Sequence, residues 1–470
     1  MAFNSLHFWL VFPPVFLLYW LIPQRLPALR KIWLIVASYL LYLNWEPVFA
    51  LVLLYVTLVT YLGARSFESV KSRKALLGWV FGLLSLAPLL AFKYYNFLNE
   101  SLTSVLELLG LHFALPGLNW AVPVGLSFFT FQATGYLFDV YRGQQEAEKN
   151  FLDYALFISF FPQIASGPIS KARDLLPQIK QPSPFSRPMA VQGLKYLLWG
   201  MFLKVVIADR LGIFVDTVYA HYLHYNGTTL LVAAVLYAIQ IYGDFAGYSL
   251  MAIGLASTLG FSLVQNFRRP YLAVSITDFW RRWHISLTRW LKDNIYIPLG
   301  GNRCSRLRCY LNILITFLVS GIWHGAAWTF IIWGILHGLI QVAEKALGWT
   351  DYKGGNPLVR ALRILATFLI VCLAWVFFRS PDLSTAVSYL GRIFTSVGIP
   401  AVSEMGGAVL LILLTALSIM VFKELREEFF PERFRFLNTK PVRWGVYLSL
   451  FCFICLFGVL DGGQFIYVSF

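Results

Sequence analysis

The sequence predicts an all-α polytopic membrane protein, and three observations lead to this fold class. Of the 470 residues, 58% are hydrophobic and only 13% are charged, whereas an ordinary soluble domain has about 25% charged residues. The mean hydropathy is +0.66. The apolar runs are continuous, as in residues 51–62 and 408–422, and lack the alternating pattern of a membrane β-barrel. A soluble, disordered or fibrous protein is therefore excluded.

The first quarter of the chain contains four clear apolar spans, at residues 6–22, 29–43, 49–63 and 75–95. No basic residue precedes the first span and no small-residue cleavage site follows it, so we expect a retained helix and not a signal peptide. A helical crossing needs about 20 apolar residues. We therefore expect roughly ten to thirteen crossings in a single integral-membrane domain over residues 1–470.

Basic residues predict the orientation of the chain. Lys and Arg outnumber Asp and Glu by 38 to 23, an excess typical of cytoplasmic loops that needs no nucleic-acid partner. Basic residues fall between the first two spans and between the third and fourth: Arg25, Arg30, Lys31, Arg65, Lys71, Arg73 and Lys74. These loops are expected in the cytoplasm, which places the N-terminus outside. The loop at 99–119 has no Lys or Arg and is expected outside.

The middle of the chain is less regular. Its apolar segments are broken by Pro, Gly and isolated charges, and they lie at 122–140, 151–166, 190–219, 228–243 and 246–264. Some are short enough to be re-entrant, so the parity of crossings here stays open. Further spans are expected at 309–323, 326–346, 359–378, 406–422 and 441–460. No internal repeat is evident, which weakens the case for an inverted-repeat transporter.

The densest polar region lies at residues 265–310 and predicts an amphipathic interfacial helix. Its apolar face carries Phe279, Trp283, Leu287, Trp290 and Leu291. Its polar face carries Asp278, Arg281, Arg282, Arg289 and Lys292. Such a helix suits the membrane interface. Two readings stay open: a basic surface contacting anionic lipid, or a mouth that attracts the phosphates of a polyanionic cosubstrate.

Two histidines are the candidate catalytic residues. His324 is surrounded by apolar sequence, where an ionisable side chain is costly and indicates a functional site. A neutral imidazole there can act as a general base near pH 7, and the alternative is a structural hydrogen bond to a neighbouring helix. His284 lies 40 residues earlier, within the amphipathic segment, and is the second candidate. His337 is expected to be a packing or polar-contact residue. Small residues that permit close approach surround His324: Gly321, Gly325 and Ala326.

Other kinds of chemistry have little support in the sequence. His221 and His224 are accompanied by no carboxylate or Cys, so we expect no metal site. No G-x-S-x-G, P-loop or G-x-G-x-x-G motif occurs, which argues against a serine hydrolase or a nucleotide-driven pump. The Cys452–Cys455 pair lies in an apolar run, and we expect both thiols to pack in the core. Charged residues within apolar stretches either form buried ion pairs or line a polar passage: Asp209, Arg210 and Asp244.

Several of these segments resemble a known family. The run 278–287, continuing through 290–291 to 296–303, resembles the signature of bacterial membrane-bound O-acyltransferases. Residues 321–325 are similar to that family's catalytic-histidine motif. Further similar stretches are 123–132, 160–163 through 167–169, and Phe465–Ile466–Tyr467. The branch that this chain resembles most contains the alginate O-acetyltransferase membrane subunit and relatives for peptidoglycan and other exopolysaccharides; teichoic-acid D-alanylation proteins are more distant.

The resemblance implies a bundle with re-entrant and interfacial helices around a transmembrane tunnel, in a bacterial inner membrane. His324 would be the central catalytic residue and His284 the second histidine, nearer the cytoplasmic mouth. Donor binding is assigned to Arg281, Arg282, Lys292 and Trp323. Acetyl-CoA would be the donor substrate, with no permanently bound cofactor and no metal. The acetyl group would pass outward to an exported polysaccharide, with an extracytoplasmic transferase as partner. Two alternatives remain: D-alanyl transfer from a carrier protein to teichoic acid, and a non-enzymatic transporter or flippase.

Overall fold

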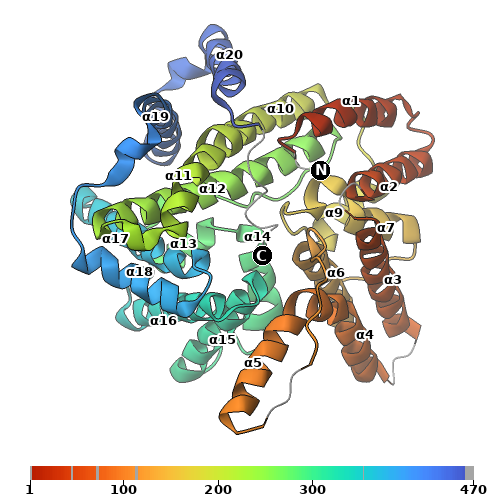
Figure 1. Cartoon of the computed structure of the whole chain (residues 1–470). Helices are drawn as coiled ribbons and strands as arrows, with labels where there is room; N and C mark the ends of the chain where they lie inside the picture. The colour runs from red at the N-terminus through yellow and green to blue at the C-terminus, as the bar shows by residue number, and fades with distance from the viewer. Residues whose placement is uncertain (1–2, 44–45, 70–72, 112–114, 353, 461–470) are drawn as a thin grey trace.

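The computed structural model describes residues 3–43, 46–69, 73–111, 115–352 and 354–460, and every regular element in these ranges is a helix. The predicted all-α class is confirmed. Lys71 and the segment Phe465–Ile466–Tyr467 lie outside the described residues. Figure 1 shows the helices in a ring-like arrangement, with α1 to α4 on one side and α16 to α20 on the other.

Eight helices of the described ranges are long and apolar enough to cross a membrane. They are α3 (Pro47–Ser69), the continuous α4–α5 (Lys74–Leu108), α12 (Gly227–Thr258), α15 (Arg306–His324), α16 (Trp328–Leu347), α17 (Pro357–Arg379), α19 (Gly407–Phe429) and α20 (Lys440–Phe457). The shorter helices α1 (Leu6–Leu21) and α2 (Pro27–Leu43) match the first two predicted spans. The ten to thirteen expected crossings remain a prediction, since several expected spans are divided into short helices.

Further shorter helices lie between the long ones. They are α6 (Leu126–Tyr141), α7 (Phe151–Ser159), α8 (Phe161–Ile164), α9 (Ala172–Lys180), α10 (Arg187–Met201), α11 (Asp209–Ala220), α13 (Ile276–Arg282), α14 (Ile285–Leu291) and α18 (Leu383–Thr395). The expected span at 190–219 is thus two α-helices joined by a π-helical segment, Phe202–Ala208. A second π-helical segment, Leu90–Tyr94, joins α4 to α5, so the expected outer loop at 99–119 is helical as far as Leu108.

One prediction of the middle region is wrong. The two expected spans at 228–243 and 246–264 form a single helix, α12, of 32 residues. Gly243, at the expected break, serves close packing instead: a Cβ atom there would lie 3.0 Å from the carbonyl oxygen of Leu203. A Cβ atom on Gly247, one turn later, would lie 2.8 Å from the carbonyl oxygen of Gly200 on α10. The backbones of α10 and α12 therefore cross in direct contact, which only small residues permit.

Buried charges hold the same helices together. Lys204 lies 2.7 Å from a carboxylate oxygen of Asp209 and 2.6 Å from one of Asp244, and all three side chains are nearly inaccessible. Of the two readings of these charges, the structure supports buried ion pairs that fix helix packing, because a buried charge must be paired. Arg210 instead donates to the carbonyl oxygen of Phe457 at the end of α20.

The cysteine prediction is also wrong. Cys452 and Cys455 are free and exposed on α20, outside the packed core. In a membrane protein an apolar helix surface can face lipid, so an apolar sequence run does not by itself indicate burial.

Candidate active site

The segment that holds His284 is not the continuous helix that the sequence predicts. It is divided into α13 and α14, and between them His284 adopts a left-handed conformation, with φ 43° and ψ 53°. The amide of Ile285 donates to the carbonyl of Asn266 (2.9 Å), and the amide of Arg268 donates to the carbonyl of Arg282 (2.9 Å). These bonds to residues 266–268 replace the helical bonds at the break. Positive φ is costly for a residue with a Cβ atom, and such strain often occurs at functional sites.

The predicted division of this segment into two faces is nevertheless correct. All five residues of the expected apolar face are buried: Phe279, Trp283, Leu287, Trp290 and Leu291. The break therefore changes the direction of the chain without exposing its apolar side chains. It turns the His284 ring into the protein, where the residue is fully buried.

A single amide side chain orients His284. Its Nδ1 lies 3.1 Å from Oδ1 of Asn266. The same oxygen accepts from the backbone N–H of Ser286 (3.2 Å), which identifies it as the carbonyl oxygen of the amide. The Nδ2 group of Asn266 donates to the hydroxyl of Ser249 (3.1 Å). Nδ1 of His284 must therefore be the protonated nitrogen, and the neutral ring presents Nε2 as its basic atom.

His324 lies at the end of α15 and is surrounded by aromatic rings. Its side chain is 2% exposed. Its ring centroid lies 5.0 Å from that of Trp333 and 5.3 Å from that of Phe378. The centroid of the His284 ring is 6.5 Å away. The structure thus brings together the two histidines, which are 40 residues apart in the sequence.

The close approach of α15 and α16 depends on Gly321, one turn before the end of α15. A Cβ atom there would lie 2.4 Å from the carbonyl oxygen of Phe330. The expectation that small residues allow close packing beside His324 is confirmed.

Sequence analysis did not identify Lys93, which supports the end of α15. Its Nζ donates to the backbone carbonyl oxygens of Trp323 (2.8 Å) and His324 (3.0 Å) and lies 3.3 Å from the hydroxyl of Ser127. The last carbonyls of a helix lack intrahelical partners, and a cation is favourable at this end. Lys93 interrupts the apolar run at 75–95, and an isolated lysine at membrane depth is itself a signal of function.

Two cavities lie near His324, at the end of α15. The first has a volume of about 410 Å³ and extends to Ser320, one turn before His324; it is bordered by Arg281, Lys292 and Lys345. The second, of about 20 Å³, is lined by Lys93, Ser127, Trp323 and His324 itself, among others. His324 therefore lies beyond the inner end of a basic cavity and on the wall of a second, much smaller one.

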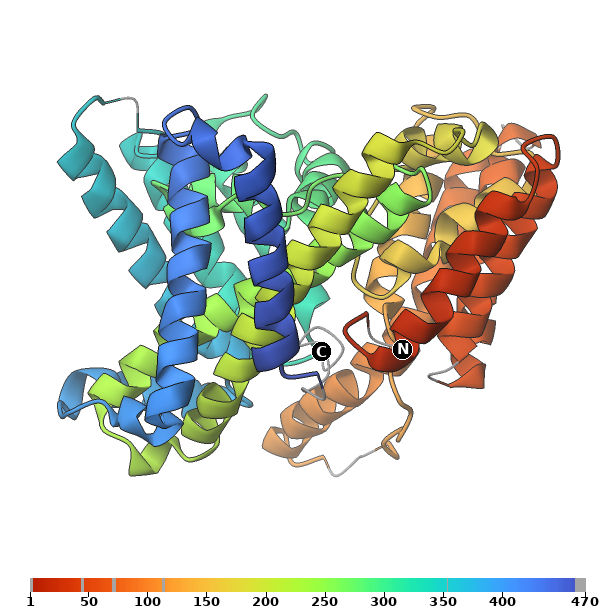
Figure 2. The ribbon, with the colours of Figure 1, turned by 90° about the horizontal axis from the view of Figure 1, so that it is seen from above.

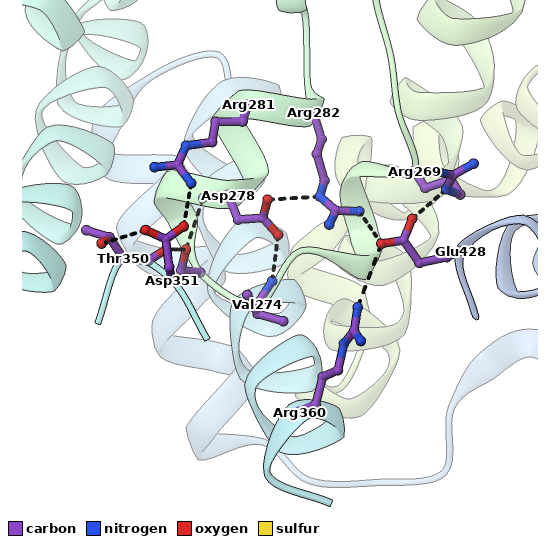
Figure 3. A network of polar contacts seen from close by, with 10 residues as sticks. Arg269, Val274, Asp278, Arg281, Arg282, Thr350, Asp351, Arg360 and Glu428 are labelled. Carbon is purple, nitrogen blue, oxygen red and sulfur yellow. Dashed lines mark hydrogen bonds and ion pairs between the residues drawn. The ribbon is translucent and has the colours of Figure 1, made fainter. Parts of the chain in front are cut away.

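The neighbouring arginines Arg281 and Arg282 point in different directions (Figure 3). Arg281 lines the 410 Å³ cavity and pairs with Asp351 at 2.5 Å, a contact in which both side chains are about half exposed. Arg282 instead donates to Asp278 and to Glu428 on α19, each at 3.0 Å. Burial lowers the pKa of Arg282, but its contacts with these two carboxylates outweigh burial and raise it.

Glu428 also accepts from Arg269 (2.7 Å) and lies 3.9 Å from Arg360. Arg282 thus belongs to an ion-pair network that attaches α19 to α13 (Figure 3). Of the predicted donor-binding residues, the structure places Arg281 and Lys292 at the cavity and Arg282 away from it.

The other predicted site residues are buried. Trp323 is 3% exposed and packs against both histidines, with centroid distances of 5.8 Å to His284 and 4.9 Å to His324. It borders the 20 Å³ cavity and not the 410 Å³ one. His337 accepts from Nε1 of Trp280 at 3.3 Å, the polar contact that was expected.

His221 and His224 stack on each other, with ring centroids 6.0 Å apart. In the part of the chain that the structure describes, no group of three His, Cys, Asp or Glu side chains is arranged to hold a metal ion.

Comparison with known proteins shows what the chain is similar to. Residues 72–350, which include both histidines, match the membrane-bound O-acyltransferase family. A probable alginate O-acetylase AlgI of Pseudomonas putida is 38% identical over 94% of this chain and 89% of its own length. A peptidoglycan O-acetyltransferase of Helicobacter pylori is 35% identical over 83% of the chain and 79% of its own length. A teichoic acid D-alanyltransferase of Streptococcus thermophilus is 28% identical over 54% of the chain and 68% of its own length.

Proposed function

Because the chain belongs to the membrane-bound O-acyltransferase family, we propose that it takes an acetyl group from cytoplasmic acetyl-CoA and delivers it to a hydroxyl of an exported polysaccharide. The observation that carries the proposal is the meeting of His284 and His324, whose ring centroids are 6.5 Å apart, just beyond a basic cavity that reaches Ser320. The similarity to alginate and peptidoglycan O-acetylating proteins over most of the chain supports the acetyl group and the polymer class.

The donor enters through the 410 Å³ cavity in this proposal. Its border carries three basic side chains, Arg281, Lys292 and Lys345, which suit the phosphates of CoA. The basic turns between α1 and α2 and between α19 and α20 both lie at the upper edge of Figure 2, one at its right and one at its left, while the N-terminus lies lower. Since basic loops face the cytoplasm, this edge is assigned to the cytoplasm and the N-terminus to the outside, in a bacterial inner membrane.

The chemistry assigned to the histidines is general base catalysis. A neutral imidazole nitrogen of His324 accepts the proton of the attacking hydroxyl, whose oxygen bonds to the thioester carbonyl carbon. The carbon–sulfur bond then breaks, and the proton returns from the imidazolium to the CoA thiolate. The products are an acetyl ester and free CoA thiol, so atoms and charge balance without ATP. His284, with Nε2 as its basic atom, assists the proton transfer or orients the donor.

The acceptor side is assigned to the small cavity at Lys93. The attacking hydroxyl belongs to the polymer itself or to an extracytoplasmic transferase that completes the delivery. Such a partner would meet the face opposite the basic mouth. The cavity of about 20 Å³ is too small for a sugar, so this side must open when the acceptor binds.

The donor can be tested with purified protein in proteoliposomes. Acetyl-CoA labelled in the acetyl group is supplied on one side, and release of CoA thiol and transfer of label to a soluble oligosaccharide are followed. We expect both to require His324, while His221→Ala, an exposed histidine outside the site, serves as the matched control. Consumption of a D-alanyl carrier protein but not of acetyl-CoA would overturn the donor assignment. Acetyl movement without thioester consumption would instead support the transporter alternative.

A further inference from the structure

A second large cavity is separate from the 410 Å³ cavity assigned to the donor and exceeds it in volume. Its volume is about 1,000 Å³, and it lies between α10 and α12 on one side and α19 and α20 on the other. This volume is at the upper end of the range for pockets that bury most of a small-molecule ligand. Its inner wall is apolar and includes Leu198, Leu203, Ala246, Leu250, Phe422 and Phe453.

The rim of this cavity is strongly basic. Six Lys and Arg side chains line it against two carboxylates, Glu424 and Glu427. Arg269 and Lys423 pair with Glu427, and Glu424 accepts from Tyr242. The other four basic side chains form no ion pair within the described ranges: Lys195, Arg268, Arg426 and Arg443. The rim therefore has unneutralised positive charge above an apolar wall.

The position of the cavity in the membrane follows from the helices that form it. Only 17% of the apolar window of α19 and 11% of that of α20 is buried within the protein, so lipid covers most of both helices. Arg426 is near the end of α19 and Arg443 near the start of α20. The turn that joins these helices is at the edge assigned to the cytoplasm (Figure 2).

We propose that this cavity binds one anionic phospholipid of the cytoplasmic leaflet. The acyl chains occupy the apolar wall between α12 and α20, and the phosphate lies among Lys195, Arg268, Arg426 and Arg443. Water is a poor occupant of the apolar part, because it needs two to four polar partners. Basic pockets between membrane helices on the cytoplasmic side are suited to anionic headgroups.

The bound lipid would contact the support of the active site. Ser249 and Asn266 both line the cavity, and Asn266 bonds to His284. An occupied cavity keeps bulk water from this hydrogen bond and holds α19 and α20 against α10 and α12. The proposal concerns binding alone, so it stands or fails independently of the identity of the acetyl donor.

The test uses the full chain in nanodiscs of phosphatidylcholine doped with a fluorescent phosphatidylglycerol, and it measures lipid binding by energy transfer from protein tryptophan. We expect preferential binding of phosphatidylglycerol. The triple variant Lys195→Gln/Arg426→Gln/Arg443→Gln should lower the apparent affinity at least about tenfold. Arg25→Gln/Arg173→Gln/Arg303→Gln is the matched control: it removes three exposed charges outside the cavity and should bind as the unmodified protein does.

A second variant tests the apolar wall without changing charge. Leu250→Trp fills part of the cavity and should weaken phosphatidylglycerol binding while the protein remains monodisperse. Glycerol 1-phosphate, which has the phosphate but no acyl chains, should not displace the lipid. Equal binding by the triple variant and its control would overturn the proposal. Displacement by glycerol 1-phosphate would also overturn it, in favour of a soluble phosphate compound.

Discussion

His284 and His324 share one site but are held in different ways. His284 occupies a strained turn, and the hydrogen bond that its Nδ1 donates to the buried amide oxygen of Asn266 fixes its ring. His324 ends a regular helix, and its ring is held by packing against Trp323, Trp333 and Phe378. Lys93 donates to the backbone carbonyls of Trp323 and His324 and so supports the end of α15.

The way in which each histidine ring is held determines how it can act. A ring with one nitrogen committed to Asn266 has a fixed tautomer and direction. The His324 ring instead lines the cavity of about 20 Å³, where it can meet a reactant. We therefore infer that His324 is the group that exchanges a proton with the reactants and that His284 has a fixed supporting role beside it.

The largest effect is expected at His324. Loss of a general base costs about 10²–10⁴-fold in rate, so His324→Ala should abolish measurable acetylation of the exported polymer. His324→Gln should not restore it, because an amide forms hydrogen bonds but does not accept a proton at neutral pH. Polymer acetylation in cells measures the effect, with membrane levels of each variant determined by immunoblot. Near-normal acetylation by His324→Gln would leave this histidine only a structural role.

The next effect is expected at Asn266, the support of His284. In Asn266→Ala the His284 ring loses its fixed tautomer, and an unmade buried hydrogen bond costs about 1–3 kcal/mol. We expect kcat to fall roughly tenfold to a hundredfold, with little change in KM for acetyl-CoA. The control is Gln181→Ala, an exposed amide outside the site. His284→Ala should match Asn266→Ala if the role of His284 is support. A loss as severe as that of His324→Ala would show that His284 shares the proton transfer.

A smaller effect is expected at Lys93. Lys93→Met keeps an unbranched side chain one atom shorter than lysine but removes the donor to the carbonyls of Trp323 and His324. The end of α15 should then become more mobile, and we expect kcat to fall about tenfold, the equivalent of one charged hydrogen bond. Lys74→Met, at the start of the continuous helix Lys74–Leu108, is the control. Unchanged kcat would mean that Lys93 does not position His324.

The sequence predicted much of the fold because apolar spans are long and membrane helices satisfy their own backbone. It misjudged α12, where Gly247 permits a close crossing with α10, since the sequence alone does not distinguish a packing glycine from a helix break. It also missed the break at His284: the apolar period continues through it, and only pairing with residues 266–268 reveals the turn.

Part of the candidate site was also predictable, because an isolated polar residue is conspicuous in an apolar sequence. His324 and His284 stand out as polar residues in apolar surroundings, and so does Lys93. The role of Asn266 depends on a contact between residues 18 apart across a loop, which no local pattern indicates. Nor does the sequence show that Arg281 and Arg282 have different roles. Arg282 donates to Glu428, which lies 146 residues away in the sequence.

The smallest effect, and the one that tests this last distinction, is expected at the two arginines. The exposed pair of Arg281 with Asp351 contributes about 0–1 kcal/mol, so Arg281 is free to turn toward a donor phosphate. Arg281→Gln/Lys292→Gln should raise KM for acetyl-CoA about threefold to tenfold and flatten its dependence on salt. Arg282→Gln should leave KM unchanged but lower the thermal stability of the purified protein, because Asp278 and Glu428 lose a shared partner. Kinetics at low and high salt and a melting curve separate the two. A raised KM in Arg282→Gln at unchanged stability would place this arginine at the donor after all.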